Sequence, residues 1–123
     1  MSTRHKPLGL STHLKNMLTA VSDAQSHVEG LDKDTFLANR LVQQAVSLNL
    51  IVIGELAGQI YKDYPEFTAT HADVPWQDIR NMRNRLAHGY FAIDFEVVWD
   101  TVQNSVPTLE RFLSSRPELN GAA

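Results

Sequence analysis

Residues 37–60, LANRLVQQAVSLNLIVIGELAGQI, carry the strongest structural signal in the chain. Apolar side chains recur every three or four residues through this segment, at Leu37, Leu41, Ala45, Leu48, Val52, Leu56 and Ile60. Such spacing places them on one face of an α-helix of about six turns. A second apolar row has the same spacing and comprises Val42, Val46, Leu50, Ile53 and Ala57. The two rows together predict a central helix that is covered on more than one side.

The sequence also indicates both ends of this helix and one alternative within it. Asp32 or Asp34 can cap its N-terminus, and Tyr64-Pro65 ends it because proline disfavours a helical conformation in the residue before it. Residues 49–54, NLIVIG, taken alone could form a strand, since this segment is short and rich in β-branched residues. Helical spacing continues through both ends of the segment, and we therefore expect a helix.

A shorter helical pattern precedes the central helix. Apolar residues recur at helical spacing over residues 14–28, with Ser11 or Thr12 as the cap and Gly30 as the terminator. After the central helix, a polar loop is expected to about Asp73. The N-terminal half of the chain therefore predicts two helices joined by a short turn.

The C-terminal half predicts two more helices. Pro75 suits the first position of a helix that starts near Trp76 and stops at Gly89. Asp94 can cap the last helix, and Pro107 inside that helix predicts a kink. The patterns of both halves together indicate an all-α fold.

Composition and charge narrow the class of protein. The 123 residues suit a single domain spanning 1–123, with ends expected to fray over about 1–8 and 117–123. The absence of cysteine excludes disulfides, thiolate zinc sites and cysteine nucleophiles, and it fits a cytoplasmic location. Apolar runs are shorter than the roughly 20 residues of a membrane span, so no membrane partner is expected. A net charge of −3 argues against broad binding to a nucleic-acid backbone and favours a local contact.

One short segment is cationic in this acidic chain. Residues 80–90 read RNMRNRLAHGY, and no carboxylate lies between Asp78 and Asp94. Arginine binds phosphate through two parallel hydrogen bonds, and histidine can take and return a proton near neutral pH. The segment therefore suits a ligand that contains phosphate.

The predicted helix places these side chains on distinct faces. The residues expected to face the core are Ile79, Met82 and Leu86. The arc beside them comprises, in angular order, Arg83, Ala87, Arg80, Asn84 and His88. Within it, Arg80, Asn84 and His88 form a row with four-residue spacing whose members can touch. Arg83 and His88 diverge by about 140°, so one copy makes an incomplete site and a symmetric dimer would bring two sets to a common cleft.

Arginine and histidine together suit metal-free cleavage of RNA, in which the 2′-hydroxyl attacks the adjacent phosphate. A structural interpretation stands beside this one. The helix dipole favours an imidazole at a helix C-terminus, arginine-rich turns are often solvated, and Asn84 can simply bond its neighbours. Tyr90 by itself is typical of a packed ring with a hydrated hydroxyl. The histidines are too dispersed for a metal site and no cofactor signature is present, so neither a metal nor a cofactor is expected.

The segment from Met82 to Phe91 resembles the Arg-x4-His-x-Tyr signature of the HepT-like branch of the HEPN superfamily. Members of that branch are toxins of bacterial and archaeal toxin–antitoxin pairs. The likeness extends to residues 49–57 (NLIVIGELA), 75–79 (PWQDI) and 94–99 (DFEVVW), and no departure from the signature is visible. It therefore covers nearly the whole chain.

The resemblance implies an all-α antiparallel bundle of about five helices that forms a homodimer through the motif-bearing helices. It implies a metal-independent endoribonuclease acting on transfer or messenger RNA, with Arg83 and His88 as the catalytic pair. Arg80 and Asn84 would be supporting, RNA-binding residues. Tyr90 would receive AMP from the partner, a minimal nucleotidyltransferase antitoxin of the MntA type. The added charge and bulk would then keep RNA out of the site.

Two other functions fit the same residues. In the first, the chain is a non-catalytic helical subunit that docks and regulates a nucleotidyltransferase, with Arg83 and His88 as partner contacts. In the second, the chain is a purely structural helical dimer. Substitution of Arg83 and His88 separates these functions from catalysis, because only a nuclease would lose RNA cleavage while its dimer stays folded.

Overall fold

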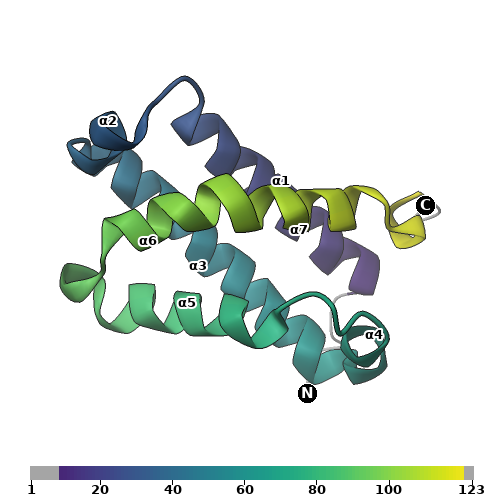
Figure 1. The fold of residues 1–123 in the computed structure, drawn as a ribbon. Coiled ribbons are helices and arrows are strands. Elements are labelled where there is room, and N and C mark those ends of the chain that lie inside the picture. Colours follow the sequence, from purple (N-terminus) through teal and green to yellow (C-terminus); the bar gives the residue numbers. More distant parts are fainter. Residues whose placement is uncertain (1–8, 121–123) are drawn as a thin grey trace, which may run out of the picture.

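The computed structural model describes residues 9–120, and its helices form two crossed layers (Figure 1). One layer holds α1 and α3, which run antiparallel. The other holds α5 and the C-terminal helical segment, which is residues 95–114. None of the described residues lies in a strand, which confirms the predicted all-α fold. The α-helices are α1 (Leu10–Val28), α2 (Lys33–Leu37), α3 (Arg40–Asp63), α4 (Pro65–Thr70), α5 (Trp76–His88), α6 (Phe95–Asp100) and α7 (Val106–Ser114).

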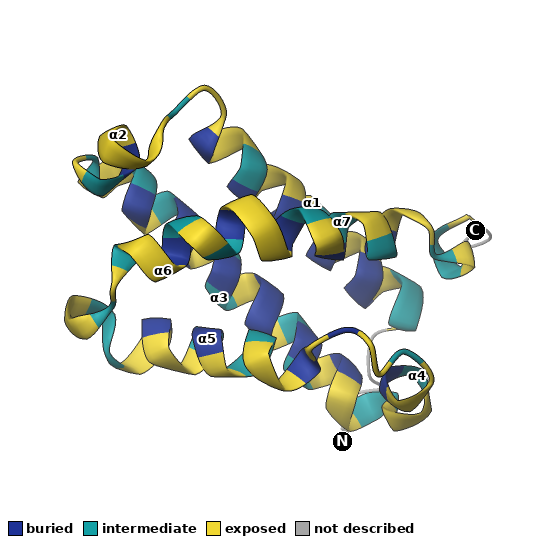
Figure 2. Ribbon diagram, in the orientation of Figure 1, coloured by how far each residue is buried: buried dark blue, intermediate teal, exposed yellow. Residues whose placement is uncertain are grey.

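α3 lies at the centre of the core and carries both buried and exposed residues along its length (Figure 2). The buried part of the second row comprises Val46, Leu50, Ile53 and Ala57. In the first row, Leu41 is 76% exposed, Leu48 60% and Val52 37%. The first row lies about 120° around the helix from the second, and it is fully buried only at its end, at Ile60. α1 and α5 pack along α3 and leave Leu41, Leu48 and Val52 open. α3 is thus covered on more than one side, by α1 and by α5, as predicted, although part of its first apolar row stays exposed.

The start of α3 also differs from the prediction. Asn39, not an aspartate, caps α3, since its side chain accepts a hydrogen bond from the Val42 backbone N–H at 3.1 Å. Asp32 caps the short α2 instead. The Gln43 side chain donates to the carbonyl oxygens of Phe36 and Leu37, both at 3.0 Å, and so ties the end of α2 to α3. Residues 49–54 lie inside α3 and are helical, as predicted.

The helix ends and connections around α1 and α5 agree only in part with those predicted from the sequence. α1 begins at Leu10 without a side-chain cap, so the proposed caps at Ser11 and Thr12 are wrong. Gly30 adopts φ +79°, the left-handed region that glycine tolerates, and it ends the turn after α1. The expected polar loop before Asp73 contains a helix, α4, which has Pro65 at its first position. α5 starts at Trp76 and ends at His88, as predicted.

The C-terminal segment contains the predicted irregularity in an unexpected form. Residues Thr101–Ser105 make a π-helical turn between α6 and α7, and the Val106 backbone N–H donates to the Thr101 carbonyl oxygen. Pro107 has no N–H to donate, and the wider turn just before it accommodates that loss. Pro117–Leu119 forms a 3₁₀ turn, and the fraying expected from residue 117 stays a prediction. The expectation for residues 1–8 and 121–123 lies outside the described residues.

By length and composition alone, α3 could cross a membrane, with a mean hydropathy of 1.4 over its most apolar stretch. Within this structure α1 and α5 pack along it, and its buried row fills the core. Such packing is expected of the central helix of a folded domain. The length and hydropathy of α3 are therefore only weak evidence for a membrane span.

Candidate active site

The candidate site lies where α5 crosses α3. Gly54 of α3 sits directly against Arg83 of α5, and a Cβ atom on Gly54 would overlap the Arg83 Cβ. That atom would also lie 2.8 Å from the Arg83 Cγ and 3.1 Å from the carbonyl oxygen of Ile79. Glycine is the residue that lets the two helices approach this closely. Gly54 therefore fixes the point from which the Arg83 side chain leaves α5.

Two side chains hold the Arg83 guanidinium at the surface. Its Nη2 donates to Glu55 Oε2 at 3.0 Å, and its Nη1 donates to Asn84 Oδ1 at 3.1 Å. The Arg83 side chain is 27% exposed and that of Glu55 53%, so water screens this ion pair, and its contribution to stability is at most about 1 kcal/mol. These bonds use only part of the donor set of a guanidinium. Arg83 is thus positioned and still able to bind a phosphate oxygen.

Arg80, one turn earlier on α5, is placed in a similar way. Its guanidinium carbon lies 5.0 Å from the centre of the Tyr61 ring, a cation–π contact. Its Nε would lie 3.8 Å from a Cβ on Gly58. Gly54 and Gly58 are one turn apart on α3, as Arg80 and Arg83 are about one turn apart on α5. Both arginines therefore reach across α3 on the same side of α5.

His88 and Tyr90 lie at the far end of α5. His88 is the last residue of the helix, and its side chain is exposed. Gly89 ends the helix, as predicted, at φ −146°, and a 3₁₀ turn follows from Tyr90. The half-buried Tyr90 ring packs edge-to-face against Phe91 and Phe95, with both pairs of ring centroids 5.6 Å apart. The packed ring predicted for Tyr90 is confirmed.

The structure brings only part of the predicted site together within one chain. Arg83 and Asn84 are in contact, whereas Arg80 contacts Tyr61. Among residues 9–120 no hydrogen bond or ion pair joins His88 to another side chain, so the row Arg80, Asn84 and His88 is not linked by such bonds. α5 is continuous from Trp76 to His88, which keeps Arg83 and His88 on diverging faces, as the helical geometry predicts.

Two neighbours of the site were missed by the sequence reasoning. Tyr61 lies under Arg80, and Phe91, next to Tyr90, is almost fully exposed. The four-residue spacing of Gly54 and Gly58 is the signal that could have located the helix crossing, and with it Tyr61. Phe91 stands inside the motif segment, but its exposure could not be read from spacing.

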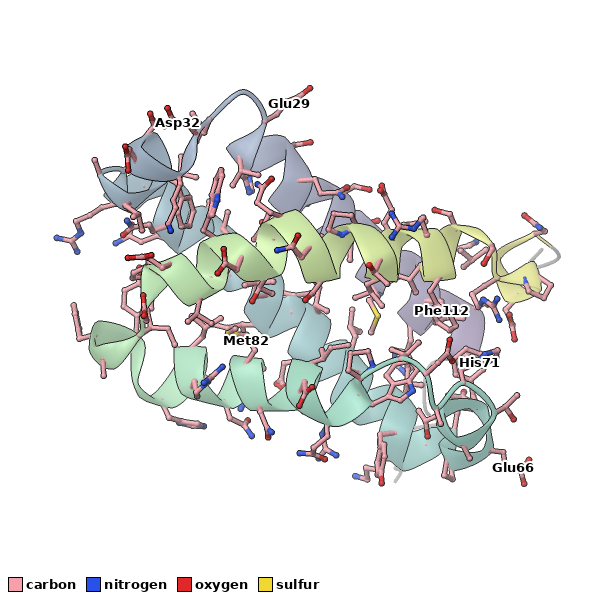
Figure 3. The ribbon with its side chains drawn as sticks, in the orientation of Figure 1. Glu29, Asp32, Glu66, His71, Met82 and Phe112 are labelled. Carbon is pink, nitrogen blue, oxygen red and sulfur yellow. The ribbon has the colours of Figure 1, made fainter. Side chains whose placement is uncertain are left out.

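The groups that the motif offers for chemistry are a guanidinium, an amide, an imidazole and a phenol. In the part of the chain that the structure describes, no three or more histidine, aspartate or glutamate side chains gather where they could hold a metal ion. On the core side of α5, Met82 lies between that helix and the C-terminal helical segment (Figure 3). The guanidinium can bind phosphate, and the imidazole can transfer a proton.

Comparison with known proteins places these features in a family. Residues 17–116 match the family "Ribonuclease HepT-like". The chain is 31% identical to a protein of Thermococcus cleftensis named "Probable ribonuclease HepT", over 80% of this chain and 86% of that protein. It is 34% identical to a "Putative RNase" of Methanocaldococcus jannaschii, over 76% of this chain and 75% of that protein. A "Putative RNase" of Caldanaerobacter subterraneus is 29% identical, over 80% and 86% respectively.

A comparison with solved structures gave no significant match. The fold is all-α, and the match covers every residue of the candidate site from Arg80 to Tyr90. This chain belongs to the HepT-like ribonuclease family, and the resemblance drawn from its sequence is confirmed.

Proposed function

We propose that this protein is the toxin of a HepT/MntA-type toxin–antitoxin pair and acts in the cytoplasm as a metal-independent endoribonuclease on transfer or messenger RNA. The observation that carries the proposal is the placement of Arg83. Its Cβ rests on Gly54, and Glu55 and Asn84 hold its guanidinium at the surface. An arginine fixed in this way is ready for a phosphate, and the family relationship supports RNA as the source of that phosphate.

Arg83 and His88 have complementary roles in the proposed reaction. His88 accepts the proton of the RNA 2′-hydroxyl while the 2′-oxygen bonds to the adjacent phosphorus. The bond from phosphorus to the 5′-oxygen breaks, and the imidazolium returns a proton to that leaving oxygen. Arg83 stabilises the charge on the phosphate oxygens. The products carry a 2′,3′-cyclic phosphate and a 5′-hydroxyl, and DNA is spared because it lacks the attacking group.

A homodimer would bring together Arg83 and His88, which lie on diverging faces of α5 within one chain. The exposed apolar row of α3 supports such a dimer, because contiguous apolar surface of this kind marks an interaction site. This row, which comprises Leu41, Leu48 and Val52, leads along α3 to Glu55 and hence to its ion pair with Arg83. Two chains packed through this row and the Arg83 side of α5 would form an isologous interface. Arg83 of one protomer would then share a cleft with His88 of the other.

Tyr90 is the proposed point of control. A nucleotidyltransferase of the MntA type would transfer AMP from ATP to its hydroxyl. Tyr90 follows His88 by two residues, and the contacts of its ring with Phe91 and Phe95 fix its direction in the turn. The added phosphodiester would place negative charge and bulk beside His88, where the RNA phosphate must bind.

The proposal is tested by incubating the purified protein with total cellular RNA in EDTA. Wild type should leave fragments with 2′,3′-cyclic phosphate ends, and Arg83→Ala and His88→Ala should abolish cleavage without unfolding the dimer. Arg111→Ala is the matched control, because Arg111 is an exposed arginine on α7, outside the motif helix. Cleavage that persists in His88→Ala or stops in EDTA would contradict the proposal. Absence of cleavage, with substitutions that weaken nucleotidyltransferase binding, would favour the docking subunit.

A further inference from the structure

Phe91 is the most exposed of the large apolar side chains that the structure describes, at 93%. It follows His88 by three residues and lies in the 3₁₀ turn Tyr90–Ala92 that ends α5. Phenylalanines elsewhere in the described chain are buried or half-buried: Phe36, Phe67, Phe95 and Phe112. An aromatic ring is therefore exposed to solvent directly after Tyr90, the last residue of the motif.

The turn that carries Phe91 is held in place. Its backbone is closed by hydrogen bonds from the Ala92 N–H to the Gly89 carbonyl oxygen at 2.9 Å and from the Ile93 N–H to the Tyr90 carbonyl oxygen at 3.2 Å. The Phe91 ring meets the Tyr90 ring at an interplanar angle of 79°, and Tyr90 in turn meets Phe95 at 73°. Edge-to-face contacts of this kind leave the broad face of the outermost ring open.

The charged groups around the turn suit a polyanion. Arg85 and His88 are exposed at the end of α5. On the other side of the turn, Asp94 accepts the Glu96 backbone N–H at 2.9 Å as the cap of α6. The Glu96 carboxylate pairs with Lys33 at 2.7 Å, which raises the pKa of that lysine. A nucleic-acid strand that reaches Phe91 therefore passes an imidazole and a guanidinium, while the nearest carboxylates in the sequence are already engaged.

We propose that Phe91 is a substrate-positioning residue whose ring stacks on an unpaired base of the RNA next to the phosphate that is cut. This inference rests on the proposed ribonuclease function and adds a binding contact to it. Stacking on an aromatic ring is open to any base, and it supplies affinity that does not depend on a basic surface, which this acidic chain lacks. A protein anchor is less well matched, because the neighbouring Tyr90, Ile93 and Phe95 pack against the core and so offer less apolar surface beside Phe91.

Loss of the ring should act on binding and spare the chemical step. Phe91→Ala is expected to raise KM for an RNA oligonucleotide about 10-fold with little change in kcat, the size of effect that one base–aromatic stack supplies. Phe91→Trp should keep a low KM, because indole stacks at least as well. Phe91→Leu should behave like Phe91→Ala, since it restores apolar surface without a planar ring.

A second readout does not require cleavage. In the His88→Ala background, an RNA that carries 2-aminopurine beside the scissile position should lose fluorescence on binding, and the additional change Phe91→Ala should remove that quenching. Val97→Ala is the matched control, because Val97 is an exposed apolar residue on α6 outside the motif. It should change neither KM nor quenching.

The outcomes separate this inference from the function on which it rests. Failure of wild type to cleave RNA in EDTA would overturn the proposed function itself. Cleavage by wild type with an unchanged KM and unchanged quenching in Phe91→Ala would overturn only the stacking role. A low KM in Phe91→Leu, or a change in dimer elution with Phe91→Ala, would overturn it in favour of a protein contact.

Discussion

Gly54 of α3 and Arg83 of α5 lie so close together that a Cβ atom at position 54 would overlap the Cβ of Arg83. This one contact sets the spacing of the two helices and the point from which the proposed catalytic arginine projects. Stability and activity are therefore coupled at Gly54.

Gly54→Ala is expected to lower the free energy of unfolding by about 1–3 kcal/mol, because the added methyl group must push α5 away from α3. RNA cleavage should fall as well, since Arg83 moves with α5. Gly58→Ala is the matched control, because the nearest atom, Arg80 Nε, lies 3.8 Å away and alanine favours a helix. Chemical denaturation compares the two variants, and equal losses in both would contradict this role for Gly54.

Leu48→Glu tests the proposed dimer interface. Leu48 is 60% exposed in the single chain, so the substitution should leave the fold intact. In a dimer it would bury a carboxylate against the apolar row of the other chain, which is strongly unfavourable. We expect a folded monomer without RNA cleavage, measured by light scattering and circular dichroism. Val97→Glu, at an exposed apolar position on α6, should remain dimeric and active, and a dimeric Leu48→Glu protein would show that the interface lies elsewhere.

Tyr90→Phe should separate activity from its control. The phenol takes no part in the proposed proton transfers, so cleavage should persist. The variant should not accept AMP, because it has no hydroxyl at position 90. Wild type and variant are incubated with ATP and the nucleotidyltransferase partner, and intact mass is then measured. Tyr61→Phe is the control, since Tyr61 is an exposed tyrosine on α3 and Tyr90 remains available. A Tyr90→Phe protein that still gains the mass of AMP would rule out this residue as the acceptor.

The cap of α2 makes a pH-dependent contribution to stability. The Thr35 backbone N–H donates to Asp32 Oδ1 at 2.8 Å, and this bond, together with one from the Thr35 side chain, lowers the pKa of Asp32. The contribution is therefore present above the pKa of the unfolded chain and is lost as the pH falls through the lowered pKa of the folded protein. Asp32→Ala should melt below wild type at neutral pH, and the difference should narrow on acidification. A difference independent of pH would contradict this origin.

Much of the fold could be predicted because long apolar patterns specify helices directly. The α5 boundaries follow from Trp76 and Gly89, and both were correct. The start of α3 was not, because Asp32 and Asn39 are both good caps and local sequence does not choose between them. The choice depends on the tertiary bonds of Gln43 to the end of α2.

The motif nominates the residues of the candidate site, but it does not predict their contacts. Arg83, His88 and Tyr90 can be recognised from the motif, since they lie within one short segment. The packing of Gly54 against Arg83 and of Tyr61 under Arg80 depends on how two helices cross, which no local pattern records. The exposure of Leu41, Leu48 and Val52 was not foreseen for the same reason, because one sequence does not reveal whether its own chain or another covers an apolar row.

The central claim is that two chains build one RNA-cleaving site from Arg83 of one protomer and His88 of the other. Subunit exchange between Arg83→Ala and His88→Ala proteins, each inactive alone, tests it most directly, with native mass spectrometry to show that mixed dimers form. Mixing should restore part of the wild-type cleavage in EDTA, because one intact Arg83–His88 pair is rebuilt across the interface. Mixed dimers that form and remain inactive would contradict it.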